Sequence, residues 1–187
     1  MTAGRAFPSQ SIPTDDAIAA ALGIEDLRLG RHFLRDEGGK RAGSIWLDTY
    51  WMLRVKPSFD DHGLVGVAAA HGEESKGVKP PGWIKAVLSC ADALVVWDIE
   101  ADPLPPFLSR LPLLRSCGSM FLDGVGYELR SNSLDVHANL RFSNPVAFEF
   151  VTFEAACLQL AQRIARASGN QALIRFGATW AGYCTRT

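Results

Sequence analysis

The sequence lacks a long apolar run and an excess of charge of either sign. No stretch reaches the roughly 18 consecutive apolar residues that a membrane helix needs, and residues 1–10 contain no apolar core like that of a signal peptide. The 19 basic and 20 acidic residues leave a net charge of −1, so no overall field attracts the chain to phosphates or to an anionic membrane. We therefore expect a cytoplasmic protein that binds neither a membrane nor nucleic acid.

Closely spaced cysteine pairs are also missing. Zinc sites and redox-active disulfides usually carry two cysteines in a C-x-x-C spacing. The cysteines here are far apart, each among mostly apolar neighbours, namely Cys90, Cys117, Cys157 and Cys184. We expect reduced, partly buried thiols, although four cysteines would allow two disulfides in an exported protein. The sequence gives no sign of a metal site or of a cofactor.

Local motifs of the common enzyme classes are absent as well. The chain has no G-x-S-x-G elbow, no P-loop and no H-E-x-x-H. His71-Gly72-Glu73 matches the start of the zinc deaminase signature, but the P-C-x-x-C that should follow is missing. These absences do not exclude an enzyme, because catalytic side chains can converge from distant parts of a chain.

The composition is that of an ordinary folded protein, with 48% hydrophobic and 21% charged residues. A chain of 187 residues is near the usual size of one compact domain. We therefore expect a single α+β domain over residues 1–187, in which residues 1–13 are flexible.

The first part of the chain predicts a short helix followed by a hairpin. Thr14 resembles the N-cap of a helix that ends before Gly23. Residues 27–34 fit a second helix or an irregular segment. Residues 44–55 and 64–70 are apolar runs separated by turn-forming residues, which predicts an antiparallel hairpin with a long loop.

The clearest amphipathic pattern lies in residues 83–95, where apolar side chains recur at helical spacing. Pro80 and Pro81 fit the first turn of such a helix, because proline lacks the N–H that a first turn leaves unpaired. Residues 98–112 contain four prolines and predict a surface connection with at most one turn of helix.

The last part predicts a second hairpin and a second long helix. Residues 120–130 and 134–142 flank a turn-forming tripeptide. Thr152 is a candidate cap for a helix that ends at Gly169, which suits the left-handed conformation after a helix. Residues 173–180 predict an edge strand or an irregular tail. The predicted fold is thus a mainly antiparallel sheet from two hairpins, packed against two longer helices.

One candidate site has the residue types of an acid–base pair. His71 with Glu73 or Glu74 follows the predicted strand 64–70. His62 lies at the other end of that strand, roughly 20 Å away at the usual rise per residue, so His62 and His71 should not share a metal.

A second candidate site joins a tryptophan to carboxylates. Trp97 is followed by Asp98, Glu100 and Asp102. Tryptophan ordinarily lies in the core, and burial is our first expectation for Trp97. If exposed, it would anchor a basic partner together with these acids. The one basic cluster, residues 28–41, contains acids of its own and predicts a solvated, partly self-paired surface.

Residues 121–169 carry a resemblance to a known kind of protein. Their elements are Leu122-Asp123-Gly124, Tyr127-Glu128-Leu129, a strand ending in Asn144-Pro145 and a closing helix rich in alanine and leucine. This unit resembles small bacterial proteins, among them immunity proteins that neutralise toxins. The resemblance implies a protein that covers a partner's functional surface.

Three hypotheses for the function follow. The first is a non-catalytic protein-binding module, of the kind that immunity-type inhibitors provide, which binds a partner such as a toxin through Trp97, Asp98, Glu100 and Asp102. The alternative is a hydrolase or transferase that uses His71 with Glu73 or Glu74. A structural subunit of a larger assembly is the third, and the sequence does not separate it from the first.

Overall fold

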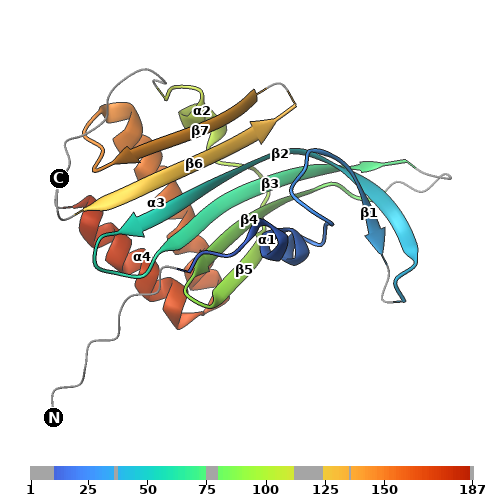
Figure 1. Ribbon diagram of the computed structural model, residues 1–187, viewed down its shortest axis with the longest axis horizontal. Helices are drawn as coiled ribbons and strands as arrows, with labels where there is room; N and C mark the ends of the chain where they lie inside the picture. Colours follow the sequence, from blue (N-terminus) through green and yellow to red (C-terminus); the bar gives the residue numbers. More distant parts are fainter. Residues whose placement is uncertain (1–10, 36–37, 75–79, 112–123, 135, 186–187) are drawn as a thin grey trace, which may run out of the picture.

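One antiparallel sheet with helices on both faces forms the body of the molecule (Figure 1). The computed structural model describes residues 11–35, 38–74, 80–111, 124–134 and 136–185. Within these ranges, seven strands and four helices are present. The fold is therefore α+β, as the sequence predicts, but with more strands than two hairpins supply.

The strands run in the order β5-β4-β3-β2-β6-β7 across the sheet, with β1 also paired to β2. Their bounds are β1 Gly30–Arg35, β2 Arg41–Pro57, β3 Gly63–Glu73, β4 Trp83–Cys90, β5 Ala93–Asp98, β6 Val125–Ser133 and β7 Val136–Ser143. The helices are α1 Asp15–Leu22, α2 Pro105–Leu108, α3 Phe148–Ser168 and α4 Gln171–Cys184. Because β2 is 17 residues long, β1 pairs with its first part and β6 with its second part.

Several local predictions are confirmed. The hydroxyl of Thr14 accepts a hydrogen bond from the N–H of Ala17 and caps α1, and Gly23 ends this helix with a φ of 79°. The predicted hairpins are present as β2–β3 and β6–β7, although the predicted residues 120–123 lie outside the described ranges. These elements carry their start and stop signals within a few residues.

The predicted helix over residues 83–95 is wrong. These residues form β4 and β5, which pair antiparallel through a tight turn at Ala91 and Asp92. Both faces of β4 are buried, since Leu88 belongs to the core under α3 and α4 whereas Val87 belongs to the core under α1. A strand that is covered on both sides has no polar alternation, so its apolar positions can imitate a helical pattern.

The structure differs from three further predictions. Gly30–Arg35 is the strand β1 rather than a helix or an irregular segment. α3 begins at Phe148, and the hydroxyl of Thr152 donates to the carbonyl oxygen of Phe148 at 2.9 Å instead of capping the helix. Residues 173–180 belong to α4, whose N-cap Asn170 accepts hydrogen bonds from the second and third residues beyond it.

The two faces of the sheet are covered unequally. In Figure 1, α3 and α4 lie behind the sheet, while the short α1 lies in front of it near β4 and β5. The larger core contains Trp51 and Phe153 and extends along both long helices. The smaller core joins Ile18 and Leu22 of α1 to the sheet. Neither long helix, nor any other in the described ranges, has the length and apolar character needed to cross a membrane.

Candidate functional site

A hollow of about 670 Å³ lies on the face of the sheet that carries α3 and α4. Its apolar lining comes from three neighbouring strand positions. Ala69 of β3 pairs with Ile84 of β4, and the N–H of Ile99 donates to the carbonyl oxygen of Ile84 at 2.9 Å.

The charged groups that line this hollow within the described residues are all acidic. They are Asp48, Asp98 and Glu100. Asp98 and Glu100 are exposed to solvent, whereas Asp48 is half-buried beside His71. Clustered carboxylates over an apolar surface attract a cation that carries an aliphatic stem, as lysine and arginine side chains do.

Trp97 stands at the border of this acidic hollow. Its side chain is 42% exposed, so the expectation that it belongs to the core is wrong. A second hollow of about 440 Å³ lies between Trp97 and Arg163 of α3, and Asp98 and Glu100 line both hollows. The structure thus brings together three of the four residues in the predicted partner-binding group.

The fourth residue of that group, Asp102, faces the protein interior. Its carboxylate accepts hydrogen bonds from Nε1 of Trp51 and from the N–H of Leu104, both at 2.9 Å. Burial raises the pKa of Asp102, and the two hydrogen bonds oppose that rise. Asp102 therefore fixes the start of the proline-rich connection rather than presenting charge to a partner.

The predicted acid–base residues are separated by other interactions. Glu73 binds the guanidinium of Arg31 and the hydroxyl of Ser44, and the Arg31 hydrogen bond lowers the pKa of Glu73. His71 instead meets Asp48, with Nδ1 lying 2.8 Å from both carboxylate oxygens. Glu74 is exposed.

Asp48 was not a candidate in the sequence because its position depends on a register shift. The pairing of β2 with β3 slips between Leu47 and Thr49, so Asp48 has no direct partner on β3 and reaches His71. The two predicted sites are therefore neighbours. Asp48 lines the acidic hollow together with Asp98 and Glu100, and His71 is bound to Asp48.

His62 is distant from these residues at the other end of β3. Burial is the main cause that lowers its pKa, and the charge of Lys56 acts in the same direction. Within the part of the chain that the structure describes, no three histidine, cysteine or acidic side chains are grouped as a metal site requires.

A buried polar network, which the sequence did not indicate, lies between β6 and the long helices. The hydroxyl of Tyr127 donates to the carboxylate of Glu154, and Nε1 of Trp180 donates to the Tyr127 oxygen at 2.8 Å. Burial raises the pKa of Glu154 and, to about 12, that of Cys184. The described cavities do not reach these residues, so we assign the network a structural role.

Among the described cysteines, Cys90, Cys157 and Cys184 form no disulfide, and the first two are buried. Cys117 lies outside the described residues.

The chain matches no protein-family model, no curated protein and no solved structure. The function is therefore inferred from the geometry and charge of the sites themselves.

Proposed function

We propose that the protein is a non-catalytic binding module that holds a basic, extended segment of another protein along β5. The observation that carries the proposal is the half-exposed Trp97 beside two hollows that share the exposed carboxylates of Asp98 and Glu100. Tryptophan is among the residues that most often dominate binding energy at interfaces, and acids next to it would select a basic partner. An immunity-type inhibitor would cover the functional surface of a toxin in this way.

The backbone of β5 supports this binding mode. β5 ends the sheet, and the bond from Ile99 to Ile84 fixes which residues face β4. With the register of Trp97 opposite Ala86, residues 93, 95, 97 and 99 direct their N–H and C=O groups toward β4. Leu94, Val96 and Asp98 therefore direct theirs away from the sheet. An extended peptide can add to such an edge through main-chain hydrogen bonds.

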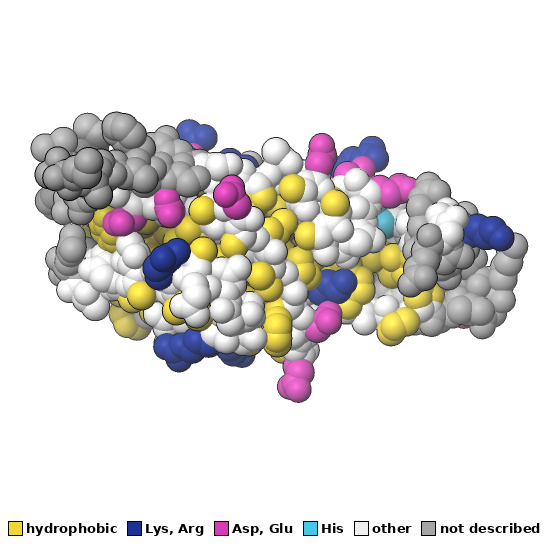
Figure 2. Space-filling model, turned by 90° about the horizontal axis from the view of Figure 1, so that it is seen from below, with side chains coloured by type: hydrophobic (Ala, Val, Ile, Leu, Met, Phe, Trp, Pro, Cys, Tyr) yellow, Lys and Arg dark blue, Asp and Glu magenta, His cyan; other side chains and the backbone are white. Residues whose placement is uncertain are grey.

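The side chains along this edge suit a partner that makes apolar contacts and carries charge beside them. Figure 2 views the molecule from the side of β5 and shows hydrophobic side chains gathered along its middle, with acidic and basic side chains around them. β5 carries no lysine and no proline, residues that commonly protect an exposed edge strand from pairing with other chains. A partner strand would cover this edge and place basic side chains near the acidic hollow.

Affinity capture with matched baits tests the proposal. The bait is the tagged protein, incubated with lysate of its source organism, and the retained proteins are quantified by mass spectrometry. The site variant is Trp97→Ala with Asp98→Asn and Glu100→Gln. The control variant is Asp16→Asn with Glu149→Gln, which also removes two acidic charges but from the first turns of α1 and α3.

We expect a basic protein that is retained stoichiometrically by the wild type and by the control, and is lost with the site variant. Its retention should decrease as salt increases, because charges near the surface are screened. A partner retained equally by all three baits would contradict the placement of the site.

A second candidate function is supported by the His71–Asp48 pair. A carboxylate at Nδ1 orients an imidazole, as in acid–base catalysis, and Asp48 lines the acidic hollow. Asp48 replaces Glu73 and Glu74 in this hydrolase or transferase hypothesis. Hydrolysis of ester and phosphoester substrates by the wild type, compared with His71→Gln, tests it. Equal rates in the two proteins would reject this role for His71.

A further inference from the structure

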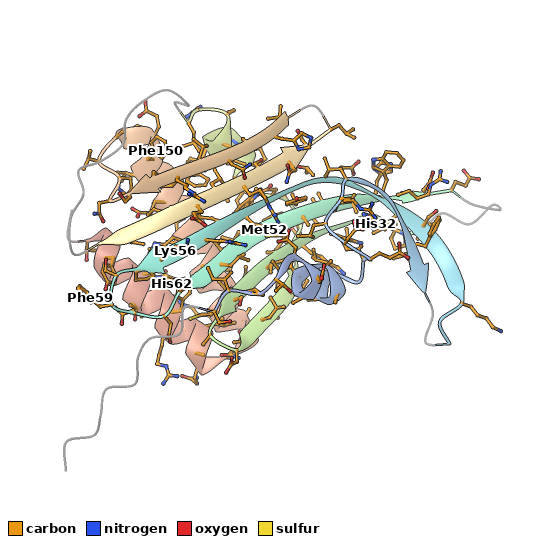
Figure 3. All side chains as sticks on the ribbon, in the orientation of Figure 1. His32, Met52, Lys56, Phe59, His62 and Phe150 are labelled. Carbon is orange, nitrogen blue, oxygen red and sulfur yellow. The ribbon has the colours of Figure 1, made fainter. Side chains whose placement is uncertain are left out.

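The opposite face of the sheet carries a groove of about 480 Å³ beside α1. Met52 of β2 and Leu64 of β3 supply buried apolar side chains at its base. Figure 3 labels Met52 and Lys56 on β2, on the part of this face that α1 leaves uncovered. The groove is thus separated from the acidic hollow by the thickness of the sheet.

Cations from two strands converge on one carboxylate at this groove. Nζ of Lys56 lies 2.9 Å from Glu128, Nε of Arg141 lies 3.3 Å away, and a guanidinium nitrogen of Arg54 lies 3.9 Å away. The register explains the cluster, because Arg54, Glu128 and Arg141 are direct neighbours across β2, β6 and β7. Among the described residues, this cluster keeps two positive charges that Glu128 does not balance.

In the next row on this face of the sheet, the positive charge of Arg130 is balanced by a carboxylate. Arg130 forms two hydrogen bonds with the carboxylate of Asp15 at 2.7 and 2.9 Å, and its guanidinium lies 5.3 Å from the centre of the Tyr50 ring. The Asp15 interaction also raises the pKa of Arg130. This pair ties the start of α1 to β6 and forms a neutral wall of the groove. Because Lys56 forms the closest pair with Glu128, the surplus positive charge of the cluster lies on Arg54 and Arg141.

The donors in that row remain accessible. The side chain of Arg141 is 84% exposed and uses Nε toward Glu128, and Arg54 lies beyond hydrogen-bond distance of that carboxylate. A guanidinium has five N–H donors in a planar fork that matches phosphate and carboxylate oxygens. The two arginines, which both line the groove, can therefore coordinate a further anion outside Glu128.

We propose that this groove binds a small organic molecule in which a doubly charged anionic group, such as a phosphate monoester, is attached to an apolar body. The two unbalanced charges match a dianion, and the base at Met52 and Leu64 offers an apolar contact. The volume of the groove falls in the range of small-molecule sites, roughly 300–1,000 Å³, and is small for a macromolecular interface. This site is independent of the partner surface along β5.

Titration with phenyl phosphate, followed by calorimetry and by amide chemical shifts, tests the site. We expect saturable binding of one molecule per chain, with shifts in β2, β6 and β7. Arg54→Gln with Arg141→Gln should weaken binding by about tenfold or more, because it removes both guanidinium groups that would bind the anion. Glu128→Gln should strengthen binding, because it removes the carboxylate that competes for the same cations.

The control is Arg166→Gln with Arg175→Gln, which removes two cations from α3 and α4 and should leave the affinity unchanged. Inorganic phosphate should bind more weakly than phenyl phosphate, since it lacks the apolar body. Absence of saturable binding, an affinity that the Arg54/Arg141 variant does not lower, or equal binding of both phosphates would overturn the proposal. The amide spectrum of the Arg54/Arg141 variant shows whether that variant is folded, which separates misfolding from loss of the site.

Discussion

Replacing Tyr127 by phenylalanine should destabilise the protein strongly, although it removes only one oxygen atom. The hydroxyl of Tyr127 donates to Glu154 and accepts from Nε1 of Trp180. Trp180 is fully buried and Glu154 is 5% exposed, so water has little access to either group. Tyr127→Phe therefore leaves the Trp180 N–H in the core without its acceptor and removes one hydrogen bond of Glu154, which keeps its hydrogen bond with Cys184.

The magnitude follows from these two groups. Leaving a buried polar group unsatisfied costs about 1–3 kcal/mol, and more when the group is charged. The unsatisfied Trp180 donor costs about 1–3 kcal/mol and the lost Glu154 hydrogen bond about 1–2 kcal/mol, so the total loss is about 2–5 kcal/mol. This loss is large against a typical free energy of unfolding of about 5–15 kcal/mol. For a chain of this length, a loss of about 3 kcal/mol lowers the melting temperature by roughly 6–12 °C.

Urea unfolding followed by fluorescence and circular dichroism measures this loss, with Tyr50→Phe as the control. Tyr50 is hydrogen-bonded to Asn132, which is half-exposed and can bind water instead, so the control should lose about 1 kcal/mol or less. If both variants lost the same small amount, the reasoning about the buried network would be refuted.

Three further predictions concern the core and the acidic residues. Burial raises the pKa of Glu154 above its ordinary value of 4.5, so the folded state retains a proton that the unfolded state releases. The free energy of unfolding should therefore decrease as pH rises from about 4.5 through the folded-state pKa. Glu154→Gln lacks this titration, so its stability relative to the wild type should increase over the same window. Urea unfolding between about pH 4 and pH 8 measures the difference. Gly63→Ala should lower the free energy of unfolding by about 1–3 kcal/mol, because its Cβ would lie 2.2 Å from the buried Phe176 ring. Gly126→Ala should not, because its Cβ would meet nothing closer than 3.9 Å. Thermal melts compare the two variants. Asp102→Ala should cost about 1–3 kcal/mol by depriving Trp51 and Leu104 of their acceptor, and Asp98→Ala should stay within about 0.5 kcal/mol in the same melts.

The elements that could be predicted from the sequence have local signals. Thr14 and Gly23 bracket α1 by side-chain capping and a left-handed φ, which are properties of single residues. The long loop between β2 and β3 is rich in turn formers, and the strands on either side are apolar. Such signals act over a few positions and do not depend on the rest of the fold.

The elements that were missed depend on tertiary packing. β4 is buried on both faces, and the turn at Ala91 has a φ of 52° without a glycine to mark it. β-branched residues such as Val87 and Val96 favour strands, whereas the prediction of a helix rested on the spacing of the apolar residues alone. α4 follows α3 after only Gly169 and Asn170, so the helix end predicted at Gly169 is correct, whereas the helix that Asn170 caps was predicted as an edge strand or an irregular tail.

The candidate site shows the same division. Trp97, Asp98 and Glu100 adjoin in the sequence, so their grouping could be predicted, but the exposure of Trp97 could not. Asp48 comes to His71 from another strand and by way of a register shift. Glu154 meets Tyr127 only because α3 packs on the sheet over β6. No sequence pattern connects such distant residues.

Quantitative capture with the three baits tests the proposed β5 surface most directly. If β5 and its acidic border hold the partner, one basic protein is retained in stoichiometric amount by the wild type and by the Asp16/Glu149 control. It is then lost with the Trp97/Asp98/Glu100 variant. Equal retention of that protein by the Trp97/Asp98/Glu100 variant would place the partner elsewhere on the molecule and contradict the proposed function.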